Sequence, residues 1–357
     1  MILTQKERGQ IILKQASKQA SKQASKDYSI SFVRFVATIF IIVCHVQQYY
    51  NIELCWWFNV GVQMFFYISG YLYSNRVIED SIAWNCKQFL KILVPYYICV
   101  VITSGIGFFL HAGCGIKQIF HLIVLNGTGG FITLDHTWFI SYILLCYMIT
   151  PALLNMKIIC RNNITFVFRM LFLLCGMFIF FELYAKYYKS AWIICYTLGI
   201  IFGQFETYHS KNTNKRLKIF AVFIAAITNL IAIYFDYFSD ELFYGFSRFF
   251  NYSHVFLGIA LVIILKQLYK TIPSKERYNK ILDLSDKYSF YIYLTHQIFI
   301  LGEFSLLGVV DNLLLGLIAV IACTFISAYI LYLLSSQISP IVNRFIAKLL
   351  FEVTIED

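Results

Sequence analysis

The sequence predicts an all-α fold: a polytopic membrane helical bundle of about ten transmembrane helices with both termini in the cytoplasm. Composition is the first reason, because 59% of the 357 residues are hydrophobic, only 13% are charged, and the mean hydropathy is +0.69. A soluble domain of average composition carries about 25% charged residues. The second reason is that apolar runs recur along the chain at about the 20-residue length that a helix needs to cross a bilayer. A lipid bilayer is therefore the expected partner of most of the surface.

Ten apolar segments are long enough, or nearly so, to be transmembrane helices. They cover residues 30–50, 55–73, 88–110, 137–154, 164–184, 191–204, 217–235, 249–265, 288–307 and 313–334. A shorter apolar stretch at 116–125 is predicted to be an interfacial or re-entrant piece. The chain then divides into a basic low-complexity tail at 1–29, a ten-helix domain at 30–335 and a C-terminal tail at 336–357.

Basic residues are segregated between the two sides of this arrangement. If ten helices alternate in direction, 23 of the 29 Lys and Arg residues fall on the side that holds both tails, and four fall on the other side. Such an excess marks the cytoplasmic side, so we expect both termini in the cytoplasm and a bacterial plasma membrane as the location. Because the basic residues alternate with apolar segments, the net charge of +10 does not indicate nucleic-acid binding.

The N-terminal tail contains the tetrapeptide QASK three times, at 15–26. On a helix this period places the three lysines on one stripe. The tail is either a basic arm that rests on anionic lipid headgroups or a solvated low-complexity segment.

The ten cysteines do not form a recognisable disulfide or metal framework. Most lie inside apolar runs, where a thiol behaves as a small hydrophobic group. Cys55 and Cys114 lie near loops on the same predicted side and could form a disulfide. No spacing among histidines, cysteines and acidic residues indicates a metal site.

The first predicted helix contains two ionisable residues, Arg34 and His45, at a depth where charge is costly unless it is paired or hydrated. They are eleven residues apart, close to three helical turns, so they project from nearly the same face at a separation of roughly 16 Å along the axis. With the N-terminus inside, Arg34 lies near the cytoplasmic boundary and His45 lies past the midplane. We interpret the pair as lining one channel.

The chemistry of these two side chains suits group transfer. A buried neutral imidazole can remove a proton from a hydroxyl group that attacks a carbonyl, and a guanidinium can hold phosphate or carboxylate. Each residue also has a structural explanation: Arg34 as a snorkelling residue at the cytoplasmic boundary, and His45 as a helix-packing hydrogen bond. Their shared face favours the functional interpretation of both.

Four further positions near the second and third predicted helices are candidates for binding. Ser69 stands among small residues that permit close approach of another backbone. Arg76, Lys87 and Lys91 form a basic cytoplasmic approach to the third helix.

Two later helices carry further candidates. Trp138 opens the fourth helix, either as a binding residue or as an interfacial anchor. In the ninth helix, Tyr293 and His296 are three residues apart and could form a polar stripe into the bundle. The remaining histidines are expected at the surface; they are His111, His121, His136, His209 and His254.

Several motifs, taken in order, resemble acyltransferase family 3 of integral membrane proteins. The first is R-x10-H, formed by Arg34 and His45, and the second is FNVGVQMFFYISGYL at 58–72. They are followed by the basic run into Pro95, by Trp138-Phe139-Ile140, and by the segment from Tyr291 to His296. The resemblance runs from about residue 30 to about residue 334 and includes the ten-helix count.

The resemblance implies an enzyme that moves an acyl group, usually acetyl, from a coenzyme A thioester to hydroxyls of extracytoplasmic carbohydrates. It implies that His45 is the essential histidine and Arg34 its paired arginine. Gln63 and Met64 stand where many members have an acidic residue. The chain therefore looks closer to stand-alone members that act on surface polysaccharide or lipid-linked glycan.

We accordingly expect acyl-CoA, with acetyl-CoA favoured, as the donor substrate, a carbohydrate as the acceptor and no permanently bound cofactor. The phosphates of the donor are expected near the cationic side chains Arg34, Arg76, Lys87 and Lys91. The acceptor is expected near Ser69, Trp138, Tyr293 and His296. His45 would act as general base or as transient acyl carrier. The alternatives are a transporter or flippase for a polar lipid-linked sugar, and a sensor or scaffold without chemistry.

Overall fold

The computed structural model describes residues 26–127, 129–156, 163–183, 189–238, 246–273 and 275–351. The QASK repeats lie outside these residues except for Lys26, the last residue of the third repeat. Every regular element in the described ranges is a helix. The all-α class is therefore confirmed.

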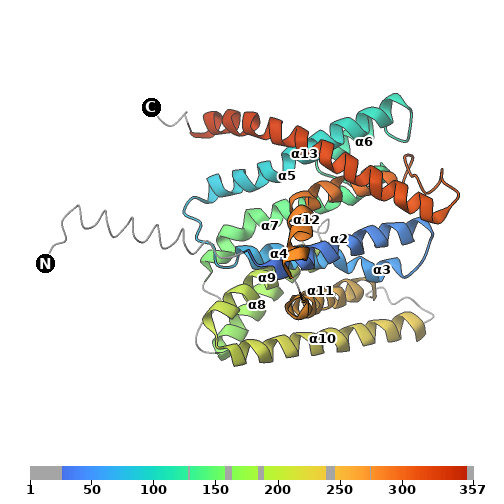
Figure 1. Ribbon diagram of the computed structural model, residues 1–357. Helices are drawn as coiled ribbons and strands as arrows, with labels where there is room; N and C mark the ends of the chain where they lie inside the picture. Colours follow the sequence, from blue (N-terminus) through green and yellow to red (C-terminus); the bar gives the residue numbers. More distant parts are fainter. Residues whose placement is uncertain are drawn as a thin grey trace.

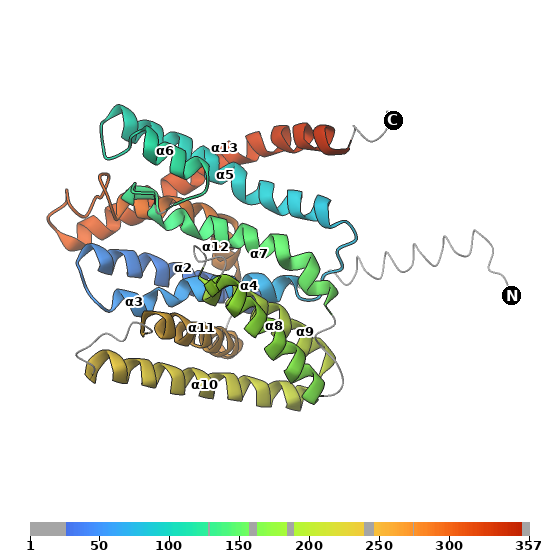
Figure 2. The same cartoon turned by 180° about the vertical axis from the view of Figure 1, so that it is seen from behind.

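Nine long helices build the bundle. They are α2 (Tyr28–Tyr49), α5 (Ser81–Phe109), α7 (Trp138–Asn155), α8 (Asn163–Leu183), α9 (Ser190–Tyr208), α10 (Lys211–Phe238), α11 (Phe246–Thr271), α12 (Lys275–Thr295) and α13 (Leu313–Phe351) among the residues described. The shorter elements are α3 (Cys55–Phe58), α4 (Val60–Tyr73), α6 (Ile116–Ile123) and the 3₁₀ helices η1 (Ile132–Thr137) and η2 (His296–Phe299). In both Figure 1 and Figure 2, α10 and α13 lie on opposite sides of the bundle, with α2 and α4 between them.

Seven stretches of the described chain are long and apolar enough to cross a membrane. They are Tyr28–Tyr49, Ser81–Phe109, Ile132–Asn155, Thr165–Leu183, Lys211–Phe235, Phe250–Thr271 and Leu313–Ile346. The protein is therefore a multi-pass membrane protein, whereas the count of ten spans stays a prediction.

The other three predicted segments form shorter or more polar elements. The segment at 55–73 is divided into α3 and α4, the segment at 191–204 lies in α9, and the segment at 288–307 leaves α12 at Thr295 and continues as η2. Most residues of α4 and α9 are buried against neighbouring helices. Burial in protein explains why these helices need not be uniformly apolar.

Capping fixes where the two helices at the basic end begin. The Asp27 carboxylate accepts a hydrogen bond from the Ser29 backbone N–H at the start of α2. The Asp80 carboxylate accepts from the backbone N–H groups of Ile82 and Ala83 at the start of α5. Both caps satisfy backbone donors that have no partner inside the helix.

Glycines allow α4 and α9 to touch along their backbones. A Cβ atom added at Gly70 would lie 2.0 Å from the Tyr196 carbonyl oxygen, and one added at Gly199 would lie 2.2 Å from the Tyr67 carbonyl oxygen. Small residues at a helix contact let backbones approach closely. This contact holds the centre of the bundle together, because α4 also packs against α2 and α11.

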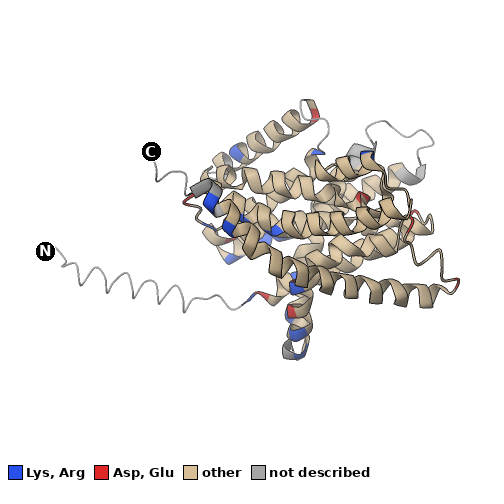
Figure 3. Cartoon of the chain, turned by 90° about the horizontal axis from the view of Figure 1, so that it is seen from above, with Lys and Arg blue, Asp and Glu red and all other residues tan. Residues whose placement is uncertain are grey.

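Lys and Arg gather toward one end of the bundle, where the beginning of α2 and the end of α13 lie (Figure 3). The first described helix and the last therefore have their outer ends on the same side (Figure 1). This agrees with the segregation of charge along the sequence. α13 continues to Phe351 instead of ending near Leu334, so the predicted C-terminal tail is largely helical.

The disulfide that Cys55 and Cys114 could form is absent, since both residues are free thiols. Cys55 begins α3, which packs on α2. Cys114 instead packs against α5 at Gly107. The two cysteines are attached to different helices.

Candidate active site

Three imidazole rings meet inside the bundle. The ring centroids of His45 and His296 are 5.1 Å apart, those of His136 and His296 are also 5.1 Å apart, and those of His45 and His136 are 6.4 Å apart. His45 belongs to α2, whereas His136 and His296 belong to η1 and η2. We call these residues the histidine cluster.

The two 3₁₀ helices place His136 and His296 in the cluster. The side-chain amide of Gln297 in η2 donates to the Ile132 carbonyl in η1 at 2.6 Å. The Tyr293 hydroxyl donates to the backbone carbonyl of His136. These hydrogen bonds satisfy carbonyl groups that an irregular backbone would otherwise leave unpaired in a membrane protein.

Hydrogen bonds determine which nitrogen of His45 carries the proton. Its Nδ1 lies 2.6 Å from Oε1 of Gln48, one helical turn along α2. An amide oxygen can only accept, so Nδ1 donates and Nε2 keeps its lone pair. A neutral imidazole in this tautomer has the free lone pair that a general base needs.

His136 and His296 have ring nitrogens without a hydrogen-bond partner in the part of the chain that is described. Nδ1 of His296 donates to the carbonyls of Tyr293 and Ile292, at 2.8 and 3.1 Å. Its Nε2, and both ring nitrogens of His136, are buried without a hydrogen-bond partner in the part of the chain that is described. Buried polar atoms are rarely left unpaired, so the ring nitrogens of His136, which lines a cavity, are suited to contact a substrate.

A cavity of about 190 Å³ opens beside the cluster. His45, His136 and Tyr293 contribute to its walls, together with Gln48 and Asn59. His296 does not line the cavity, but its ring contacts the rings of both other histidines. The cavity therefore exposes two of the three imidazoles to a ligand.

Aromatic rings form one side of this cavity. Trp138 stacks on Trp192 with 4.2 Å between the ring centroids, and the Lys189 ammonium lies 5.2 Å from the Trp192 ring. Trp56, which is largely exposed, also lines the cavity. Flat apolar ring faces bordered by amide and ammonium donors are suited to a polar ligand with some apolar surface.

Arg34 forms an ion pair that the sequence did not indicate. Its Nη1 lies 3.6 Å from Oδ1 of Asp286, and Oδ2 of Asp286 also accepts from Ser31 at 2.6 Å. Lys26 contacts the same carboxylate at 2.8 Å. Lys26 also donates a hydrogen bond to the neighbouring Asp283, which lowers the pKa of that carboxyl group.

The pairs Arg34–Asp286 and His45–His296 are arranged along the same two helices. Arg34 and His45 are eleven residues apart, Asp286 and His296 are ten residues apart, and α2 packs against α12. Both side chains of α2 therefore face α12 and its continuation η2, as their spacing predicts. The cavity at His45 does not include Arg34, so a single channel lined by both residues is not formed in this structure.

The other predicted donor contacts lie at the basic end. Lys91 is close enough to Lys87 and Arg76 for their positive charges to repel its own. Lys87 and Lys91 also line a cavity of about 350 Å³ between α5 and α13. Ser69 does not line the histidine cavity, whereas Trp138 and Tyr293 do. Their roles in binding stay predictions.

The prediction that all five remaining histidines lie at the surface is wrong for two of them. His136 is 4% exposed and His254 is 3% exposed. His254 packs against Trp57 and Phe250, away from the cluster. The position of His136 just before the apolar run that begins at Trp138 is typical of a helix end at the surface, but η1 folds inward and buries it.

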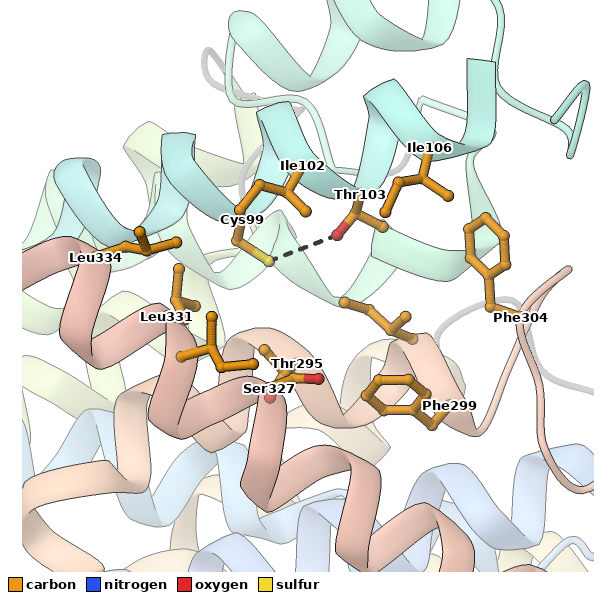
Figure 4. Close-up of a pocket in the computed structure, with 12 residues that line it drawn as sticks. Cys99, Ile102, Thr103, Ile106, Thr295, Phe299, Phe304, Ser327, Leu331 and Leu334 are labelled. Atoms are coloured by element: carbon orange, nitrogen blue, oxygen red, sulfur yellow. Dashed lines mark hydrogen bonds between the residues drawn. The ribbon is translucent and has the colours of Figure 1, made fainter. Parts of the chain in front are cut away.

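A further cavity of about 340 Å³ lies between α5, η2 and α13 (Figure 4). Its walls are almost entirely apolar, and the Cys99 thiol lies 3.9 Å from the Thr103 hydroxyl. No charged or imidazole group faces it. Its lining lacks the acid–base groups that the histidine cavity offers.

Within the described ranges, no group of three or more His, Cys, Asp or Glu residues is arranged to hold a metal ion.

Residues 27–333, which make up most of the chain, match a protein family whose description is acyltransferase domain. The chain belongs to acyltransferase family 3. The match includes α2 with Arg34 and His45, and it extends past η2 into α13. No curated protein and no solved structure matches the chain. The membrane bundle with the histidine cluster is therefore the structure of a membrane acyltransferase.

Proposed function

We propose that the protein is an O-acyltransferase that moves an acetyl group from cytoplasmic acetyl-CoA to a hydroxyl of an extracytoplasmic or lipid-linked polysaccharide. The main observation in support is that His45 lines a cavity with aromatic walls, while its Nδ1 donates to Gln48 and so leaves the lone pair on Nε2. Family membership supports the acyl transfer. A neutral imidazole is a suitable base for a hydroxyl acceptor, which supports this part of the proposal.

In the proposed reaction, Nε2 of His45 accepts the proton of the acceptor hydroxyl as its oxygen attacks the thioester carbonyl carbon. A carbon–oxygen bond forms, the carbon–sulfur bond breaks, and the proton passes from His45 to the departing thiolate of coenzyme A. The neutral His136 ring has one N–H, which is suited to donate to the negative oxygen that develops on the carbonyl. The same residues would support a double displacement in which His45 carries the acyl group transiently.

Charge supports the direction from which the donor arrives. Acyl-CoA carries several phosphate charges, and the basic end of the bundle offers Arg76, Lys87 and Lys91 to attract them. We propose that this end faces the cytoplasm of a bacterial cell and that both termini lie there. The acceptor would approach from the opposite end, past Trp56 and Lys189.

Release of coenzyme A tests the proposed function directly. The purified protein in lipid nanodiscs, given acetyl-CoA and a glycan acceptor, is expected to release free thiol in equal amount to acetyl groups on the glycan. Mass spectrometry of the glycan and a thiol assay measure the two products. A transporter or flippase would release no thiol, and such a result would contradict the proposal.

Arg34→Lys is expected to lower kcat/KM for acyl-CoA about tenfold, because a lysine cannot make the paired, planar contacts of a guanidinium. Asp286→Asn is expected to lower kcat/KM less than Arg34→Lys does. Since the two residues share one ion pair, the loss of kcat/KM in the double variant should be smaller than the product of the two single losses. Arg344→Lys, at the exposed end of α13, is the matched control. Equal kcat/KM in Arg34→Lys and Arg344→Lys would show that Arg34 only anchors the helix.

A further inference from the structure

A cavity of about 720 Å³ lies at the basic end of the bundle, bounded by α2, α4, α9, α10 and α11. We call it the lysine cavity because five lysines line it: Lys211, Lys215, Lys218, Lys266 and Lys270. Only two acidic residues, Asp27 and Glu206, line it as well. It shares no lining residue with the histidine cavity and none with the predicted donor set.

Part of the lysine cavity is an ordered polar network. Nζ of Lys218 lies 2.6 Å from Oε1 of Glu206, and the Tyr71 hydroxyl donates to Oε2 of the same carboxylate at 2.6 Å. Nζ of Lys266 donates to the Tyr71 hydroxyl at 3.1 Å. The partly exposed Glu206 carboxylate thus holds Lys218 directly and Lys266 through the Tyr71 hydroxyl.

The remaining three lysines lack such neutralisation. Lys211, Lys215 and Lys270 form no ion pair with any acidic residue that the structure describes. All three side chains are exposed and line the same cavity, so an anion bound there would reduce the repulsion between their charges. The side-chain oxygen of Asn214, on the same cavity wall, is buried without a hydrogen-bond partner, although its Nδ2 donates to two carbonyls.

These features match a ligand with several phosphate groups and at least one N–H or O–H donor. Lysine binds phosphate as a mobile point charge, and the volume exceeds that of a single phosphate ion. We propose that the lysine cavity binds the nucleotide end of the acyl-CoA donor. This inference rests on the proposed function, which supplies the donor. It gives the donor phosphates a binding site at the same end of the bundle to which Arg76, Lys87 and Lys91 attract them.

The lysine cavity and the histidine cavity lie along the same helices. On α2, the last residue that lines the lysine cavity is Val33, and the first that lines the histidine cavity is Ile41. On α4, Tyr67 lines the lysine cavity and Val62 lines the histidine cavity. At 1.5 Å per residue these intervals are about 8 to 12 Å. The pantetheine arm of coenzyme A is long enough to cross them. Between these residues, the backbone of α2 at the fully buried Ala37 packs closely on Gly61 of α4, so the arm can pass only if α2 and α4 move apart.

Equilibrium binding of adenosine 3′,5′-bisphosphate tests the proposed nucleotide site without turnover, because this compound lacks the pantetheine arm and the thioester. The full-length protein in phosphatidylcholine nanodiscs is compared with the triple variant Lys211→Gln, Lys215→Gln and Lys270→Gln. We expect the variant to bind at least about tenfold more weakly, and binding by the unchanged protein to weaken as salt screens the charges. The matched control removes three charges outside the cavity, with Lys280→Gln, Arg344→Gln and Lys348→Gln, and should bind as the unchanged protein does.

Three outcomes would overturn the assignment. The unchanged protein binds no nucleotide, the two triple variants bind equally, or phosphatidylglycerol in the nanodisc displaces the nucleotide, which would make a lipid headgroup the ligand. Failure of the proposed function looks different. The unchanged protein would then bind the nucleotide through the three lysines and release no coenzyme A with any glycan acceptor.

Discussion

His45→Ala is expected to lower acyl transfer by at least about a thousandfold, which corresponds to about 4 kcal/mol of transition-state free energy. The substitution removes the only imidazole of the histidine cavity whose Nδ1 proton is fixed by a side-chain amide, through Gln48, in the described part of the chain. Transfer of labelled acetyl to glycan in purified membranes measures the effect. Gln48→Leu should cause a smaller loss, because Nδ1 then has no acceptor and the tautomer is no longer selected.

Two comparisons separate catalysis from folding. His209→Ala removes a histidine that stacks on Phe205 at the basic end of α9, far along the chain from the cluster, and it should transfer acetyl normally. His45→Ala should bind adenosine 3′,5′-bisphosphate as the unchanged protein does, since the lysine cavity does not include residue 45. Full acetyl transfer by a well-folded His45→Ala protein would remove His45 from the mechanism.

Gly199→Leu is expected to prevent stable folding. The first atom of the new side chain would lie 2.2 Å from the Tyr67 carbonyl oxygen and 2.9 Å from the Tyr71 backbone nitrogen. These atoms belong to a helix backbone, which cannot move aside without separating α4 from α9. We expect a loss of at least about 3 kcal/mol, at the upper end for overpacked sites. Thermal unfolding in detergent, followed by size-exclusion chromatography, measures it.

Gly176→Leu is the matched control, because a Cβ atom at Gly176 meets no heavy atom within 4 Å. It lies in a helix that is apolar enough to cross the membrane, and leucine favours helix over glycine by about 0.8 kcal/mol. Its unfolding temperature should be unchanged or slightly raised. Equal stability of the two variants would show that α4 and α9 do not depend on close backbone contact.

Much of the architecture could be predicted because it follows from local composition. Helices that face lipid must be apolar over about 20 residues, so α5, α10 and α13 are visible as runs in the sequence. The count could not be settled in this way. α4 and α9 are surrounded by protein, and protein neighbours accept polar residues and shorter helices that lipid would not.

The candidate site was predictable only in part. Arg34 and His45 stand out because an ionisable group inside an apolar run is rare. His136 did not stand out, because it precedes its apolar run and resembles a residue at a helix end. Asp286 was equally inconspicuous, since it belongs to a charged segment of α12 whose sequence pattern indicates only a cytoplasmic surface.

The sequence by itself determined that this chain crosses a membrane repeatedly, which end carries the positive charge, and that Arg34 and His45 share one face of a helix. Each of these depends on hydropathy or on helical period, and both are local properties. Only the tertiary structure decided that His136 and His296 complete the cluster and that five lysines line one cavity. The Tyr293 hydroxyl and the His136 carbonyl, for example, are 157 residues apart in the chain, and such a contact depends on how helices pack against one another.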